Sequence, residues 1–176
     1  PRLTTYATNG QHHTLPQVDR EFLHRQLLEA QAAITAVLGA PPSPLWRAPY
    51  GEYNRQILGW AAELGLIHVD WTRNGRQSLD ALDWVHDPQS PSYLPAEALA
   101  RRLVAAMDAQ PGGGAGAIVL MPLASRRPEP PLLLALPLLL DELDRKGLRP
   151  IPVGELLRPQ LTKCGENATP WAMAPP

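Results

Sequence analysis

Proline and glycine limit the length of every helix and strand that this 176-residue chain can form, since it contains 21 prolines and 13 glycines. Proline lacks an amide hydrogen and glycine favours turns, so clusters of the two residues end regular elements. Such clusters lie at residues 39–51, 88–95, 111–116 and 128–137. The sequence therefore predicts short elements separated by turns.

The composition excludes several classes of protein. Hydrophobic residues make up 44% of the chain and charged residues 19%, which is typical of a globular domain. The net charge of -1 supplies no positive field for a nucleic acid, so we expect no nucleic-acid partner. The longest apolar run, 132–140, contains Pro137 and is too short for a transmembrane segment. Cys164 is the only cysteine and cannot form an internal disulfide.

Hydrophobic periodicity predicts an alternation of helices and strands. Apolar residues at steps of three and four predict helices at 19–39, 54–64, 95–107 and 136–146, with a last turn at 154–157. Apolar or alternating runs predict strands at 3–8, 45–48, 66–72, 117–121 and 148–153. Residues 73–93 show no period and are predicted to form a loop. No signal peptide is expected within these residues, because no basic segment precedes an apolar one.

This alternation predicts an α/β protein built on a parallel sheet, either a barrel or an open sheet. Functional residues of such folds lie at the carboxyl ends of strands. Residues 47–53 come at the end of one predicted strand, Asp70 and Trp71 close the next, and residues 122–127 follow another.

The segment after the second predicted strand, Arg47-Ala48-Pro49-Tyr50-Gly51, resembles the Arg-x-Pro-Tyr-Gly segment of polysaccharide deacetylases with the NodB-homology domain. Further segments resemble later landmarks of that family in the same order. They are 61–66, 83–84, 116–120, 135–143, 146–147 and 153–157. The resemblance covers roughly residues 3–157, and it predicts a deacetylase-like domain over residues 1–158 with a proline-containing tail at 159–176.

The resemblance implies a distorted (β/α) barrel that hydrolyses N-acetyl groups of amino-sugar polymers such as peptidoglycan or chitin. It also implies a divalent metal, most often zinc, and a secreted or cell-envelope location, because these polymers are insoluble. The family's early Thr-Phe-Asp-Asp segment, which carries the base and an aspartate ligand, has no counterpart here. The match begins near Thr5-Tyr6-Ala7, which resembles the family's second strand.

The implied metal ligands are His12 and His13. His13-Thr14 resembles the start of the family's His-Thr/Ser-x-x-His motif, and His12 is a substitute ligand. Either Gln17 or Leu15 occupies the position of the second histidine, depending on the alignment, and neither is a good zinc ligand. The sequence therefore departs from the family at its metal site.

Amide hydrolysis also needs a base, an oxyanion stabiliser and a proton for the leaving amine. By resemblance, Arg47 pairs with the catalytic aspartate, Tyr50 offers its backbone amide to the oxyanion, and Asp83 orients the acid. Asp70 before Trp71 is a competing alignment for Asp83 before Trp84. The alternative for Arg47 and Tyr50 is a purely structural turn.

Pro122 stands where the resemblance places the histidine that acts as general acid, and proline has no side-chain proton to donate. Trp84 and Trp71 are candidate substrate-binding residues, since indoles stack on sugar rings, although core packing is the commoner role. Three histidines are interpreted as structural or solvated: His24, His68 and His86. Arg126 and Arg127 are interpreted as part of a solvated loop.

The hypothesis from the sequence is a polysaccharide deacetylase-like domain with degraded or incomplete catalytic residues. One alternative is an active deacetylase whose base and metal ligand lie upstream of this sequence. The other is a noncatalytic glycan-binding or cell-envelope scaffold module.

Overall fold

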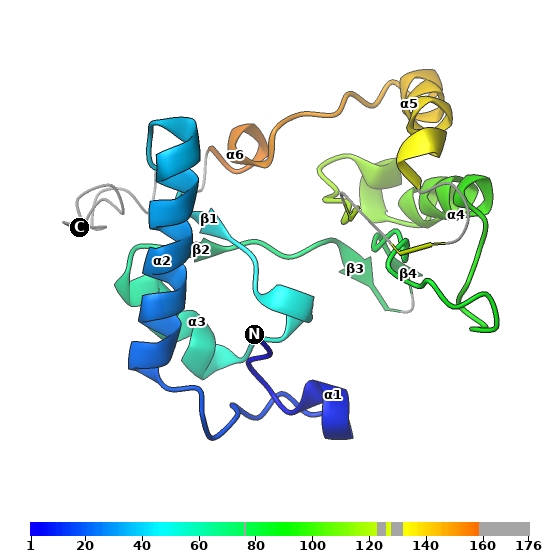
Figure 1. Cartoon of the computed structure of the whole chain (residues 1–176). Helices are drawn as coiled ribbons and strands as arrows, with labels where there is room; N and C mark the ends of the chain where they lie inside the picture. The colour runs from blue at the N-terminus through cyan, green and yellow to red at the C-terminus, as the bar shows by residue number, and fades with distance from the viewer. Residues whose placement is uncertain (76, 123–125, 128–131, 159–176) are drawn as a thin grey trace. The chain divides into compact units, whose positions relative to one another are not determined.

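The computed structural model describes residues 1–75, 77–122, 126–127 and 132–158, coloured by position in Figure 1. The chain forms two compact units. The first comprises Pro1–Asp70 with residues 157 and 158, and the second comprises Trp71–Leu156. The predicted tail of residues 159–176 lies outside the described residues, and the prediction of one deacetylase-like domain over residues 1–158 stays a prediction.

The long helix of the first unit is α2 (Arg20–Leu38), drawn in blue in Figure 1. The Asp19 carboxylate begins it by accepting a hydrogen bond from the Phe22 amide at 2.7 Å. Gly39 ends it with a left-handed backbone at φ 71°, and its amide bonds to the carbonyl of Thr35. The helix predicted over 19–39 is confirmed.

A strand–helix–strand unit follows α2. It consists of β1 (Leu45–Trp46), the 3-10 turn η1 (Pro49–Gly51), α3 (Arg55–Glu63) and β2 (Ile67–His68). The strands are parallel, with Leu45 opposite Ile67 and Trp46 opposite His68. The predicted order is confirmed, but each strand is shorter than predicted. Pro49 contributes to this, because the chain turns three residues after β1 ends.

The apolar core of the first unit lies between these helices and strands, where α2 packs against α3 (Figure 1). Its buried members are Leu3, Val18, Leu23, Ala48, Ile57, Ala61 and Leu66. Ala48 belongs to this core and directly precedes the turn η1. The core therefore fixes the carboxyl end of the parallel pair.

The strand predicted at 3–8 is wrong. Residues Tyr6–Asn9 form the helical turn α1, and Thr4 alone pairs, in an antiparallel bridge with Thr14. Gly10 adopts φ 71° and returns its amide to the Tyr6 carbonyl at 2.8 Å. Asn9-Gly10 thus closes a helical turn, where sequence reasoning placed the turn after a strand.

The second unit begins with an antiparallel hairpin of β3 (Arg73–Asn74) and β4 (Gln77–Ser78). Sequence reasoning placed these residues in a loop, although Asn74-Gly75 is a hairpin signal and Gly75 adopts φ 56°. From Leu79 to Tyr93 the chain contains no named strand or helix, as predicted.

Two helices form the core of the second unit. They are α4 (Ala96–Asp108) and α5 (Leu136–Arg145), the latter preceded by the 3-10 turn η3 (Leu132–Ala135). Pro137 lies in the first turn of α5, where no amide bond is lost. Both predicted helices are confirmed. The buried core comprises Leu79, Ala81, Leu99, Ala100, Leu103, Ala106, Met107, Leu132, Ala135 and Leu139.

The two remaining predicted strands are reduced or absent. Segment 117–121 forms a single parallel bridge, between Leu120 and Asp80. Segment 148–153 forms no strand, because Pro150 and Pro152 cannot donate ladder hydrogen bonds. The other short elements are η2 (Pro111–Gly114) and α6 (Val153–Leu156), the latter overlapping the predicted turn at 154–157.

The described residues form a mixed α/β structure with two two-stranded sheets, β1–β2 and β3–β4. No barrel closure is detected in this part of the chain, so the mixed α/β class is confirmed and the distorted (β/α) barrel stays an expectation. A closed barrel needs every strand to pair on both sides, and each of these strands pairs with one neighbour. No helix within the described ranges is long and apolar enough to cross a membrane.

Asn54 provides a test of how the N-terminal segment is fixed. Its Oδ1 accepts from the Ile57 amide at 3.0 Å and caps α3, while its Nδ2 donates to the His12 carbonyl and the Thr14 hydroxyl, each at 2.8 Å. Asn54→Ala loses all three bonds, so we expect the free energy of unfolding in urea to fall by about 2 kcal/mol.

Asp19→Ala is the matched control, because it removes only the cap of α2. We expect it to lower the free energy of unfolding by about 1 kcal/mol. Equal losses in the two variants would contradict the role of Asn54 in fixing the segment around His12.

Candidate functional site

The turn η1 presents Tyr50 to solvent in an unusual backbone conformation. Tyr50 is 68% exposed and adopts φ 61° and ψ 8°, in the left-handed region that costs a residue with a side chain about 1 kcal/mol or more. The turn is closed by the amides of Gly51 and Glu52, which donate to the carbonyls of Ala48 and Pro49, each at 3.1 Å. The Tyr50 amide is not used in either bond.

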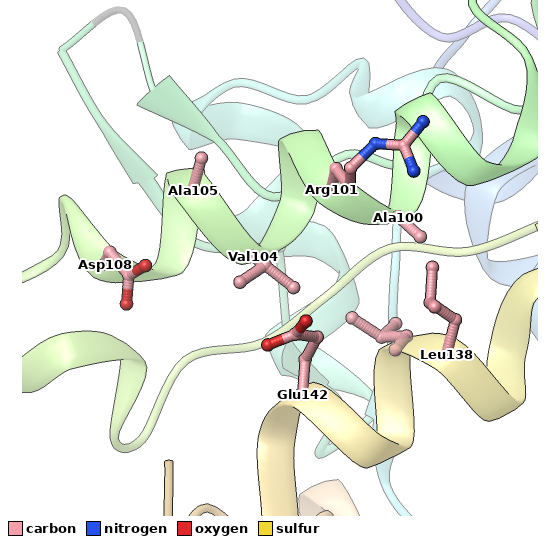
Figure 2. Close-up of a pocket in the computed structure, with 8 residues that line it drawn as sticks. Ala100, Arg101, Val104, Ala105, Asp108, Leu138 and Glu142 are labelled. Atoms are coloured by element: carbon pink, nitrogen blue, oxygen red, sulfur yellow. The ribbon is translucent and has the colours of Figure 1, made fainter. Parts of the chain in front are cut away.

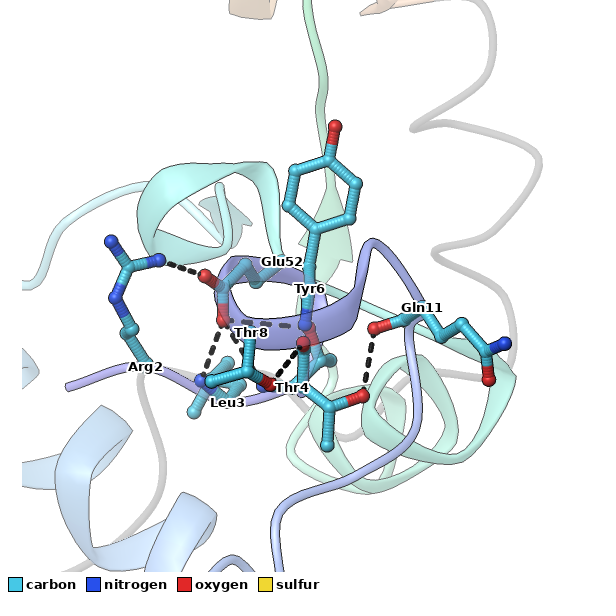
Figure 3. Close-up of polar contacts among 8 residues, drawn as sticks. Arg2, Leu3, Thr4, Tyr6, Thr8, Gln11 and Glu52 are labelled. Atoms are coloured by element: carbon cyan, nitrogen blue, oxygen red, sulfur yellow. Dashed lines mark hydrogen bonds and ion pairs between the residues drawn. The ribbon is translucent and has the colours of Figure 1, made fainter.

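A buried carboxylate fixes the other side of this turn. Glu52 is fully buried and accepts hydrogen bonds from the Leu3 amide at 3.3 Å, the Thr4 amide at 3.1 Å and the Thr4 hydroxyl at 3.4 Å (Figure 3). Arg2 forms an ion pair with its other oxygen. These contacts join the N-terminal segment to the end of η1.

The same contacts determine the protonation of Glu52. Burial disfavours the charged carboxylate, but hydrogen bonds from Thr4, Arg2 and Leu3 outweigh burial and lower the pKa of Glu52 below 4.5. The carboxylate is therefore ionised in the folded protein at neutral pH. Sequence reasoning missed Glu52, because a glutamate after a glycine carries no signal that it will be buried.

Arg2 connects this ion pair to Tyr50. Its guanidinium carbon lies 4.4 Å from the centroid of the Tyr50 ring, in a cation–π contact. The exposed ring and the buried carboxylate thus share one cationic partner, which helps to orient the Tyr50 side chain.

The two candidate metal ligands are engaged in other contacts. The His13 Nε2 lies 2.7 Å from the Gln11 Oε1, and the His12 ring stacks on Tyr6 with centroids 4.7 Å apart. Gln17 is exposed, and Leu15 packs against the apolar core. Within the residues that the structure describes, no group of three or more histidine, cysteine, aspartate or glutamate side chains could hold a metal ion. The described donors therefore do not fit the divalent metal that the resemblance implies.

A row of neighbouring aromatic rings begins at His12 and extends into the first unit. His12 is followed by Tyr53 at 6.4 Å, Tyr53 by His68 at 4.3 Å, and His68 by Trp46 at 5.2 Å between ring centroids. The Tyr53 hydroxyl donates to the Asp70 carboxylate at 3.0 Å. Asp70, the competing candidate from the sequence, therefore lies beside this row at the end of β2.

His68 is part of this row and is partly buried. Burial lowers its pKa, the charge of Asp70 opposes this effect, and the charge of Arg47 adds to it. The structural interpretation of His68 fits its place between two aromatic rings. Arg47 is exposed and directly follows β1, at the carboxyl end of the parallel pair, where site residues were expected.

In the second unit, Trp84 is 57% exposed, and its indole nitrogen donates to the Asp80 carboxylate at 3.2 Å. Trp71 is partly buried, and its indole donates to the Ser78 hydroxyl at 3.0 Å. The Arg73 guanidinium stacks 4.0 Å from the centroid of the Trp71 ring. Trp71 thus packs on its own hairpin, whereas Trp84 presents much of its surface to solvent.

Asp83 is buried and has two partners among the described residues. Its carboxylate accepts from the Leu132 amide at 3.2 Å and lies 3.5 Å from Arg127 Nη1. The Arg127 side chain is fully buried, its guanidinium stacks on Tyr93 at 4.2 Å, and it donates to the Leu94 carbonyl. The prediction that Arg127 belongs to a solvated loop is wrong, because its side chain is buried. The Asp83 carboxylate provides the counter-charge that makes this burial possible.

A groove between α4 and α5 was not predicted from the sequence (Figure 2). It has a volume of about 160 Å³, and the apolar side chains that line it include Val104, Leu138 and Leu139. Charged side chains also line it, namely Arg101, Asp108 and Glu142. None of the residues predicted from the sequence to form a site lines this groove.

The candidate residues thus fall into two groups. The first unit holds Arg47 and Tyr50 with His12 and His13, and the second holds Asp83 and Trp84 with Trp71. In the first unit, Glu52 ties the Tyr50 turn to Leu3 and Thr4, and Asn54, the N-cap of α3, ties that helix to the segment around His12. In the second unit, the buried Asp83 and the exposed Trp84 are neighbours in the sequence.

Comparison with known proteins matches residues 10–69 to the polysaccharide deacetylase family. The crystal structure of the Bc1960 peptidoglycan N-acetylglucosamine deacetylase in complex with 4-naphthalen-1-yl-N-oxidanyl-benzamide is similar in fold, with a TM-score of 0.58 at 20% sequence identity. The match covers 83% of this chain and 59% of that chain. No curated protein matches the sequence. The expected resemblance to polysaccharide deacetylases is confirmed over residues 10–69, a stretch that contains η1 and the segment around His12.

The buried Glu52 carboxylate predicts a specific acid dependence of stability. Because its folded-state pKa lies below the unfolded value of about 4.5, its contribution is complete above that pH and is lost as the pH falls through the folded-state pKa. Glu52→Gln removes this contribution. We expect it to lower the free energy of unfolding at pH 7 by about 2 kcal/mol and to flatten its decline below pH 4.5.

Urea denaturation across this pH range measures both effects. Glu63→Gln is the control, because Glu63 is exposed and its ion pairs with Arg20 and His24 are worth less than about 1 kcal/mol. A Glu52→Gln curve parallel to that of the wild type through the acid range would contradict a depressed pKa for Glu52.

Proposed function

We propose that the chain is a polysaccharide deacetylase-like domain that binds N-acetylated amino-sugar polymers of the peptidoglycan or chitin type. The observation that carries the proposal is the family match over residues 10–69, within which Glu52 fixes the turn that exposes Tyr50. Because such polymers are insoluble wall materials, the proposal includes a secreted or cell-envelope location.

In this proposal Tyr50 and Arg47 face the acetamide group of the sugar. The amide of Tyr50 stands outside the hydrogen bonds that close η1, so it has a donor to offer to the acetyl carbonyl oxygen. Arg47 is exposed next to the same turn and supplies positive charge there. A backbone amide and a cation are the groups that stabilise an oxyanion in acyl transfer.

The proposal assigns binding to this chain and leaves hydrolysis as the alternative. Hydrolysis needs an activated water and a proton donor. The described donors do not fit a metal ion, Pro122 cannot donate a proton, and Asp83 is bonded to Leu132 and paired with Arg127. The function therefore proposed is recognition of the glycan by a deacetylase-like domain with incomplete catalytic residues.

Glycan binding and acetate release, measured on the same protein, test the proposal. We expect the chain to bind an N-acetylated chito-oligosaccharide and insoluble peptidoglycan without added metal, and to release no acetate above background with zinc or cobalt. Tyr50→Ala should weaken binding about fivefold through the lost stacking surface, whereas Val37→Ala, which removes an exposed apolar side chain on α2, should leave binding unchanged.

The two contrary outcomes are distinct. Zinc-dependent acetate release that disappears in Arg47→Ala would show an active deacetylase and reject the incomplete catalytic site. Failure to bind either glycan would reject glycan recognition itself.

A further inference from the structure

The groove between α4 and α5 combines apolar and charged side chains. Its apolar lining consists of Ala100, Val104, Ala105, Leu138 and Leu139 (Figure 2). Of the leucines in this region, Leu138 is 38% exposed, and Leu133 and Leu134, in the turn η3 that directly precedes α5, are 52% and 66% exposed. Apolar surface gathered in this way marks an interaction surface, whereas isolated exposed apolar residues do not.

The charged residues of the groove have a definite order along α4. Arg101 lies towards one end of the groove and Asp108 towards the other (Figure 2). The two residues are about two helical turns apart and lie on one face of the helix. Val104 and Ala105 lie midway between them and also line the groove. Because Ala105 is small and exposed, the axis of a second helix can approach to about 8 Å at this point.

This order of charges is complementary to itself. A two-fold axis that crosses α4 between Val104 and Ala105 reverses the direction of the helix in a second copy. It places Arg101 of each protomer opposite Asp108 of its partner. Glu142 also lines the groove and precedes Lys146, the ion-pair partner of Asp108, by about one turn, so it adds negative charge at the same end. A two-fold interface requires such self-complementarity.

The ion pairs that these residues form within the chain do not prevent this contact. Arg101 lies 3.5 Å from Glu97, one turn earlier, and both side chains are largely exposed, so this pair contributes little. Asp108 pairs with Lys146 through Oδ1. The Asp108 side chain is 53% exposed, so the carboxylate can accept from a second cation.

From these observations we propose that α4 and the groove beside it form an interface between two copies of this chain. The copies pack with their α4 helices antiparallel, Val104 and Ala105 lie at the two-fold axis, and the partner covers Leu138. The two Arg101–Asp108 pairs fix the antiparallel direction, because a parallel arrangement would place like charges together. This inference is independent of the proposed function, since no residue assigned there to glycan recognition lines the groove.

An exchange of charges tests the proposal, with sedimentation velocity of the full chain as the measurement. We expect the wild type to dimerise reversibly as its concentration rises. Arg101→Asp and Asp108→Arg each create two pairs of like charges in the interface, so each should raise the dissociation constant of the dimer about tenfold or more. The double variant Arg101→Asp/Asp108→Arg pairs opposite charges again and should dimerise like the wild type.

Two leucines on α5 provide a second, uncharged test. Leu138→Gln removes apolar surface from the groove and should weaken the dimer about tenfold. Leu140→Gln is the matched control, because Leu140 is 42% exposed on the same helix and does not line the groove. Asp144→Arg changes the net charge outside the groove. Both controls should dimerise like the wild type, and urea denaturation shows whether each variant is folded.

Every contrary result overturns the proposal. A wild-type chain that stays monomeric up to about 1 mM does not use the groove to bind a second copy. A dimer that survives both single charge exchanges, or that the double variant fails to restore, forms through another face or in another direction. If a charge exchange prevents folding, the leucine variants decide, and equal dissociation constants for Leu138→Gln and Leu140→Gln contradict the interface.

Discussion

The buried carboxylate of Glu52 is the interaction on which the first unit depends. It accepts from the backbone of Leu3 and Thr4 and pairs with Arg2, so the N-terminal segment is held against the turn after β1. A buried charge is tolerated only where hydrogen bonds replace its hydration, and these donors provide that replacement. Through Arg2 the same network reaches the exposed ring of Tyr50.

The second unit uses carboxylates in a similar way. Asp83 compensates the buried Arg127, and Asp80 holds the Leu82 turn and the Trp84 indole. In each unit a buried or nearly buried acid thus orders a turn that presents an aromatic side chain. The side chains of Tyr50 and Trp84 are exposed, whereas the backbone around each of them is held in place by these hydrogen bonds.

Local sequence signals made the helices predictable. The candidate site depends on contacts between residues far apart in the chain, which the sequence does not show. Asp19 and Gly39 mark the ends of α2 in the sequence, because capping depends on neighbours within a few residues. The partners of Glu52 are about 50 positions away, and Asp83 meets Leu132 across 49 positions, so no local pattern shows them. The Arg47–Gly51 motif was recognised from its residues, whereas the positive φ of Tyr50 and the absence of barrel closure in the described residues emerged only in three dimensions.

The most direct test of this account is an NMR titration of the chain with an N-acetylated chito-oligosaccharide. The account predicts that the amide signals of Tyr50 and Gly51 shift and saturate, while signals of the groove between α4 and α5 stay in place. Shifts confined to that groove, or saturation with the signals of Tyr50 and Gly51 unchanged, would contradict glycan recognition at the deacetylase-like turn.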